Sequence, residues 1–356
     1  MTSDTALARI VGLDVARALA LFGMFAAHVG DAEPGRGWPW LVAAHGRSAA
    51  LFAVLAGVSI ALMFGGRLGR GDRERDAARH TRIRVAVRAG LLIVLSWLLS
   101  ALGTPVDVIL DNLAVMMLLA LPALRWRPAA TAGLGIGLLV AGFWLLDAVR
   151  RLVPHELFSV PVIHELWSPH YPALSWTGYV LVGMALGGWA PWRGRSLAVL
   201  GVGGLALGLG ALVGGTLAVR ATGFQWLSVV DHSYTPVEML SNVGFAAAVM
   251  AACLALAPRF PRALWPLAAT GAMTLTLYTA HIVVIALVGA EMVWQPSNVA
   301  FVVLCAACLG FASVWRWQAG QGPLERLVSN LASRAADADA RRRAPGPPVA
   351  SARMGE

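Results

Sequence analysis

Successive apolar stretches of about 20 residues constrain this chain more than any other feature of its sequence. Each is long enough to cross a hydrocarbon core about 30 Å thick as an α-helix. Ten membrane spans are predicted, at 10–29, 48–66, 85–102, 107–123, 129–149, 172–190, 197–218, 237–257, 264–289 and 298–315. We therefore expect an all-α, polytopic membrane bundle of about ten helices.

Composition leaves little sequence for a soluble domain, because 58% of the residues are apolar and only 13% are charged. We expect residues 1–331 to form one membrane domain. Residues 332–356 are polar and contain arginine and proline, so they are predicted to form a disordered basic tail in the cytoplasm.

The 28 basic residues are all arginine, and their distribution predicts the orientation in the membrane. With the N-terminus in the cytoplasm, the arginines on the outer side are Arg36, Arg47, Arg150, Arg151 and Arg220. The others lie at or near inner ends, as the positive-inside rule requires. Both termini are therefore expected in the cytoplasm, with the chain in the inner (plasma) membrane. The net charge of +9 reflects topology and contact with lipid headgroups, and does not indicate nucleic-acid binding.

Three ionisable residues interrupt the first span: Asp14, Arg17 and His28. A charge at bilayer depth costs at least about 2.5–3.5 kcal/mol, so such residues point to function. At about 100° per residue they form one polar stripe along the helix. For Asp14 and Arg17 two interpretations stay open: a structural ion pair, or a contact to an anionic ligand that a guanidinium matches well.

The predicted topology gathers histidines on the outer side, where seven of the eight lie: His28, His45, His155, His164, His170, His232 and His281. Other polar residues share this side: Arg47, Ser48, Asp107, Asp111, Asn112, Asp231, Glu238, Ser241 and Asn242. We expect a polar chamber that opens outward and is suited to proton transfer. The alternative for His28 is a packed histidine at a helix end, and for His281 a hydrogen bond between helices.

Cysteine usage and known motifs narrow the chemistry. Cys253, Cys305 and Cys308 fall within predicted spans without further ligands, so we expect buried small side chains and no metal site. The sequence has no phosphate-binding loop, nucleophile elbow or dinucleotide fingerprint.

Six motifs in order resemble a known family. They are RIVGLDVAR (9–17), GRSAALFAVLAG (46–57), YPALSWTGYVLVGMALG (171–187), HSYTPVEML (232–240), LTLYTAH (275–281) and GPLE (322–325). The chain is similar to the heparan-α-glucosaminide N-acetyltransferase-like acyltransferases, especially their bacterial branch.

This resemblance implies that cytoplasmic acetyl-CoA, as co-substrate, donates an acetyl group to an acceptor at the opposite membrane face. The acceptor is expected to be a sugar or a lipid-linked molecule, no bound cofactor is implied, and a homodimer is compatible with the family. Characterised members carry a catalytic histidine in the first outer loop, after an asparagine that ends the first span. Here His28 occupies the asparagine position, and His45 matches the loop histidine at a different spacing.

We therefore predict His28 or His45 as the general base, with Arg47 or His281 stabilising the developing oxyanion. The predicted donor- and substrate-binding residues are Asp14, Arg17, Ser48, Asp111, Tyr278, His232 and Glu238. The alternative function is a transporter or flippase of a small or lipid-linked solute, although the sequence shows no inverted repeat.

Overall fold

The computed structural model describes residues 10–65 and 72–343, and this part of the chain is helical without strands. The long helices are α1 (Val11–Val29), α2 (Arg47–Gly65), α3 (Asp72–Ser100), α4 (Leu110–Ala120), α5 (Pro128–Leu152), α7 (Ala173–Gly188), α8 (Arg195–Thr222), α9 (Pro236–Leu256), α11 (Thr274–Val288), α13 (Asn298–Ala319) and α14 (Pro323–Arg343). The short elements are η1 (Pro39–Ala44), η2 (Leu121–Arg125), η3 (His155–Ser159), α6 (Pro161–Trp167), η4 (Gln225–Leu227), α10 (Trp265–Gly271) and α12 (Glu291–Trp294). The all-α prediction is confirmed.

Seven of the described helices are long and apolar enough to cross a membrane. An eighth span results if the bent pair α10 and α11 is counted as one. Of the other predicted spans, α7 has 16 residues, and 107–123 divides into an 11-residue helix and a 3-10 turn. The chain is thus a multi-pass membrane protein, and the count of ten stays a prediction.

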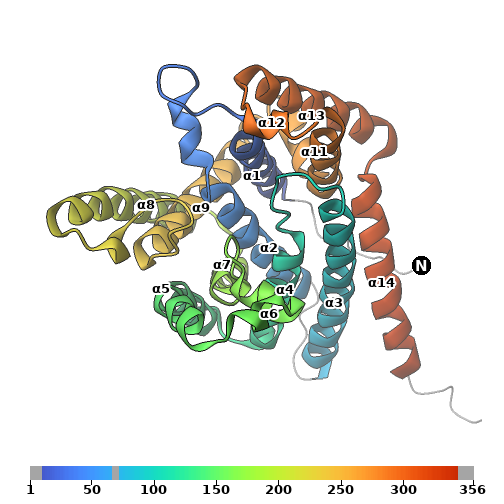
Figure 1. Ribbon diagram of the computed structural model, residues 1–356. Coiled ribbons are helices and arrows are strands. Elements are labelled where there is room, and N and C mark those ends of the chain that lie inside the picture. Colours follow the sequence, from blue (N-terminus) through green and yellow to red (C-terminus); the bar gives the residue numbers. More distant parts are fainter. Residues whose placement is uncertain (1–9, 66–71, 344–356) are drawn as a thin grey trace, which may run out of the picture.

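Helix α7 lies at the centre of the bundle, between α2 and α5 (Figure 1). Its Trp176, Tyr179 and Val180 are fully buried. The backbones of α2 and α7 touch at Gly57 and Gly183, where a β-carbon would overlap a carbonyl oxygen of the facing helix. Small residues allow this approach, which is the usual way in which helices associate in membranes.

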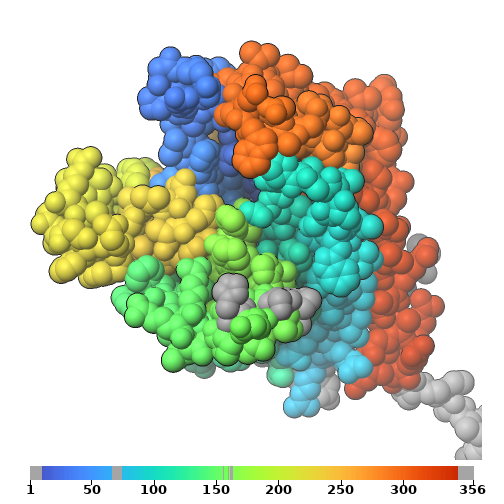
Figure 2. Space-filling view, in the orientation of Figure 1, coloured from blue at the N-terminus to red at the C-terminus, as the bar shows by residue number. Residues whose placement is uncertain are grey.

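Helix α8 packs mainly on α9 and extends sideways from the remaining helices (Figure 2), whereas α9 also packs against α1, α2 and α5. Large apolar side chains on α8 are exposed, including Val199 and Val202. In a protein that spans a membrane, such a surface faces lipid.

The span predicted at 264–289 is broken, because α10 and α11 meet at 78°. Gly271 at the end of α10 rests against the backbone of Asp14, where a side chain would overlap the Asp14 carbonyl. After the break, Glu325 of α14 accepts hydrogen bonds from the backbone N–H groups of Leu275 (2.7 Å) and Thr276 (3.1 Å). A carboxylate at this position satisfies the unpaired donors of a helix start.

The disorder expected for residues 332–356 is wrong for the part that the structure describes, because α14 continues to Arg343. Ala332 and Ala336 are buried, and α14 packs along α3. Arg79 of α3 binds Asp339 through two hydrogen bonds of 2.6 Å. Composition favoured disorder, but a partner helix supplies the burial and charge pairing that the segment lacks by itself. Residues 344–356 lie outside the described part.

Candidate functional site

Four histidines from separate segments line one cavity of about 240 Å³. His28 comes from the last turn of α1, His45 from the end of η1, and His170 and His232 from the loops before α7 and α9. Asp107, Asp231, Tyr171 and Ser48 also line it. The predicted gathering of His28, His45, Ser48 and His232 is thus present in the fold.

His28 is paired with a second histidine outside the cavity lining. Its Nδ1 lies 3.1 Å from Nε2 of His281, and the two rings are nearly parallel, at 9°. His281 is buried on α11 between the rings of Phe25 and Tyr278, at centroid distances of 4.7 and 4.9 Å. One nitrogen of the pair donates and the other accepts, so His281 fixes the ring orientation and tautomer of His28.

Two histidines of the cavity face carboxylates. His170 Nδ1 lies 2.9 Å from Asp107 Oδ2, and His45 Nδ1 lies 3.7 Å from Asp231 Oδ2. His170 and its partner Asp107 were not among the predicted site residues. The sequence did place both residues on the outer side, His170 among the histidines and Asp107 among the other polar residues. Their pairing, however, depends on how the loops before α4 and α7 fold together.

Glu238 shapes the segment that carries His232. Its carboxylate accepts hydrogen bonds from the backbone of His232 and Tyr234 and from the Ser233 hydroxyl, at 3.0, 2.6 and 3.1 Å. His232 and Tyr234 both have positive φ, 57° and 55°, a conformation that side chains other than glycine rarely adopt. Glu238 therefore positions His232 and lies outside the cavity lining.

Burial lowers the pKa of His232. The hydrogen bond of its ring to the His170 carbonyl acts in the opposite direction, but burial is the larger cause. Burial, with Asp107 as a lesser cause, raises the pKa of Tyr171 to about 12. At neutral pH the cavity wall therefore has a neutral phenol and an imidazole that favours its neutral form. A neutral imidazole has a free lone pair, which a proton acceptor needs.

Arg47 and Asp111 are two more predicted site residues that lie outside the cavity lining. Arg47 stacks over the ring of Phe245 at 5.3 Å and donates to the Ala43 carbonyl, so it does not line the cavity. Asp111 lies at the start of α4 and accepts a hydrogen bond from the backbone of Asn112. Asn112 in turn donates to Glu165 at 2.6 Å. Burial, and secondarily the charge of Asp111, raise the pKa of Glu165 to about 7.

Asp14 and Arg17 lie near the other end of α1. Arg17 forms a 2.7 Å ion pair with Asp14 and donates to the Ser59 hydroxyl of α2, also at 2.7 Å. Arg84 and Arg88 are four residues apart on α3, so their side chains share one face, and the positive charge of Arg17 also acts on Arg88. Arg88 was missed because it falls inside a stretch that the sequence marks as an apolar span. Its Nη1 contacts Met63, and its buried Nε has no partner among the described residues.

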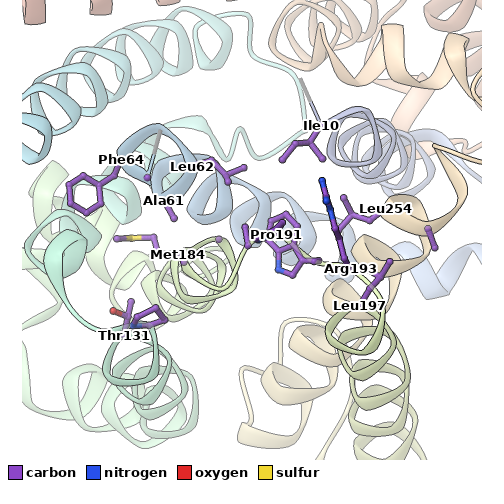
Figure 3. Close-up of a pocket in the computed structure, with 18 of the residues that line it drawn as sticks. Ile10, Ala61, Leu62, Phe64, Thr131, Met184, Pro191, Arg193, Leu197 and Leu254 are labelled. Atoms are coloured by element: carbon purple, nitrogen blue, oxygen red, sulfur yellow. The ribbon is translucent and has the colours of Figure 1, made fainter. Parts of the chain in front are cut away.

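A second cavity, of about 1070 Å³, lies at this arginine end (Figure 3). The last turn of α2, the end of α7 and the last turn of α9 surround it, and Ile10 at the start of α1 lies at its edge. Most of its walls are apolar.

Two family models match the chain. The model described as "Heparan-alpha-glucosaminide N-acetyltransferase, catalytic" matches residues 9–203, more than half of the chain. This chain belongs to that family. The N-acetyltransferase match contains His28, His45, Asp107 and His170. A second model, "Protein of unknown function (DUF418)", matches residues 188–335.

The cavity in this N-acetyltransferase family member is assembled from both matched regions, since Asp231 and His232 come from the second. The same region supplies His281, the partner of His28. Comparisons with curated proteins and with solved structures give no significant match.

Proposed function

We propose that this protein is a transmembrane acyltransferase that moves an acetyl group from cytoplasmic acetyl-CoA to an acceptor at the outer face of the plasma membrane. The observation that carries the proposal is the paired His28 and His281 at a cavity lined by His45, His170 and His232. Membership of the N-acetyltransferase family supports the reaction class. Both termini lie in the cytoplasm, as the positive-inside rule predicts.

His28 is the general base in this proposal. Its Nδ1 faces His281, so Nε2 is the nitrogen that takes the proton from the acceptor hydroxyl or amine. The acceptor atom then attacks the thioester carbonyl, the new C–O or C–N bond forms, and the C–S bond breaks. The coenzyme A sulfur leaves with the electron pair and receives the proton from His28. His45, oriented by Asp231, is the second candidate base.

The donor is held from the opposite end of α1. Arg17, Arg84 and Arg88 are the guanidinium groups proposed to bind the phosphates of coenzyme A. Arg17 and His28 are eleven residues apart, about 16 Å along the helix axis at 1.5 Å per residue. The donor therefore extends along α1 between a cationic end and a histidine end.

The acceptor presents only a small polar group to the cavity. The volume of about 240 Å³ is below the roughly 300–1,000 Å³ of pockets that enclose a drug-sized ligand. A single sugar ring, with the rest of a glycan or lipid carrier outside, fits this size and the polar lining of histidine and aspartate.

The proposal is tested with the purified protein in liposomes and radiolabelled acetyl-CoA. Glucosamine is the first acceptor probe, and a total lipid extract is the second. Acyl transfer predicts thioester consumption and labelled acceptor, with both abolished in His28→Ala. Consumption without labelled glucosamine but with labelled lipid identifies a lipid-linked acceptor. No binding and no consumption of acetyl-CoA with either acceptor would overturn the assignment.

A transporter or flippase is the alternative and predicts solute movement without an acyl donor. In transporters with broken helices, the half-helix ends point at the substrate. Here the start of α11 is already occupied by Glu325, so the N–H groups of Leu275 and Thr276 are not available to an anionic solute.

A further inference from the structure

The 1070 Å³ cavity at the arginine end shares no lining residue with the histidine cavity. Figure 3 shows Leu62, Phe64, Met184, Leu197 and Leu254 around it. Aliphatic and aromatic walls of this kind suit a hydrocarbon chain. The hydroxyl of Thr131 is the polar exception among these buried side chains, and it already donates to the Arg127 carbonyl.

The mouth of this cavity carries positive charge. Arg193 and Arg259 are exposed and line it, and none of the described lining residues is acidic. Guanidinium groups bind phosphate through paired hydrogen bonds. Trp126 and Trp192 also line the cavity, and tryptophan is enriched at the level of lipid headgroups.

The cavity is closed off from the histidines. Between the two ends, α2 and α7 are in backbone contact at Gly57 and Gly183, which leaves no space for a chain to pass along this helix pair. Val54, Leu55 and Val180 are fully buried around the contact. A molecule in this cavity therefore cannot pass between α2 and α7 toward the histidines.

We propose that this cavity binds an anionic phospholipid of the surrounding bilayer, with an acyl chain among Leu62, Met184 and Leu254 and the phosphate at Arg193 and Arg259. The cavity contacts the ends of α2, α7 and α9 and the starts of α5 and α8. The lipid therefore occupies a space bordered by five helices. Because it binds the folded state alone, it stabilises the fold.

The test is native mass spectrometry of the full-length protein in detergent with added palmitoyl-oleoyl phosphatidylglycerol or phosphatidylcholine. We expect the wild-type protein to retain phosphatidylglycerol selectively and its Tm to rise with that lipid. The double variant Arg193→Gln/Arg259→Gln should weaken retention about 10-fold and lose the Tm shift. The matched control Arg127→Gln/Arg262→Gln removes two exposed arginines of the same helix ends and should behave as wild type.

A second variant tests the cavity itself. Ala255→Phe places a ring in the space for the acyl chain and should abolish retention while both arginines stay. Equal retention in the two double variants would overturn the proposal, because the phosphate would then bind elsewhere. Displacement of the lipid by palmitoyl-CoA would instead assign the cavity to an acyl donor. Lipid binding that appears only when residues 2–8 are deleted would assign it to the chain's own N-terminal segment.

Discussion

The two ends of α1 place ionisable side chains under different constraints. At the His28 end, carboxylates and histidines are paired with each other: His28 with His281, His170 with Asp107 and His45 with Asp231. At the Arg17 end, the ionisable groups are mainly guanidinium groups on α1 and α3, and Arg17 pairs with Asp14. Paired groups of neutral or balanced charge exchange protons readily, whereas clustered cations attract an anionic ligand.

The difference also shows in what holds each end in place. The histidine cavity combines the end of α1 and the start of α2 with loop residues, and Glu238 fixes one of the loops through three hydrogen bonds. The arginines stand on the regular helices α1 and α3. Reactive residues are often found on loops that a rigid scaffold positions, whereas a guanidinium on a helix matches a phosphate through its own planar fork.

The largest expected effect is at the histidine end. Replacing His28 with alanine removes the proposed base and should lower kcat by about 10²–10⁴-fold, measured as labelled acceptor in liposomes. His281→Asn should have a smaller effect, because the base remains but its ring loses the partner that orients it. His164→Ala, on the exposed face of α6, is the control. Activity retained in both His28→Ala and His45→Ala would refute both candidate bases.

The arginine end should respond in KM. Arg88→Gln removes one of three clustered guanidinium groups, and a lost charge-assisted hydrogen bond corresponds to about 10- to 100-fold weaker donor binding. Initial rates at varied acetyl-CoA should therefore show a raised KM with kcat nearly unchanged. Arg262→Gln, exposed before α10, is the control. A fall in kcat at unchanged KM would place Arg88 with the histidines and abolish the distinction between the two ends.

Glu325 connects the ends, because it anchors the start of α11 and α11 carries His281. In Glu325→Ala the N–H groups of Leu275 and Thr276 lose their acceptor, which costs about 1–3 kcal/mol of folding free energy. The measurement is the Tm in detergent, with Glu291→Ala on exposed α12 as the control. A normal Tm with reduced kcat would instead show that Glu325 acts mainly by placing His281.

Apolar run lengths predicted the helical class and most helix positions, since a period and a length are local properties of the sequence. The break between α10 and α11 was not predicted, because the contact of Gly271 with Asp14 joins residues far apart in the chain. Residues 332–343 form a helix only because α3 supplies a partner.

The residues of the candidate site also divide into those that the sequence predicted and those whose placement depends on the fold. The grouping of histidines followed from topology and was correct for His28, His45 and His232. Which histidine faces which carboxylate depends on loop conformation, and so the His170–Asp107 pair was missed. Arg47 was predicted at the site from its place on the outer side, but its guanidinium lies over the Phe245 ring and does not line the cavity.

The smallest expected effect concerns Glu165, beside the histidine end. Its pKa is raised by burial from 4.5 to about 7 in the folded protein, so between these values the folded state holds a proton that the unfolded state releases. The stability contribution is full below about pH 4.5 and is lost as the pH rises toward 7. Glu165→Gln cannot titrate, so the fall in Tm between pH 5 and pH 7.5 should be smaller than in the wild-type protein. Asp147→Asn, on an exposed face of α5, should leave that fall unchanged. An identical pH dependence in Glu165→Gln and wild type would show that the carboxyl is solvated, and that the polar region around Asn112 is open to water like the neighbouring cavity.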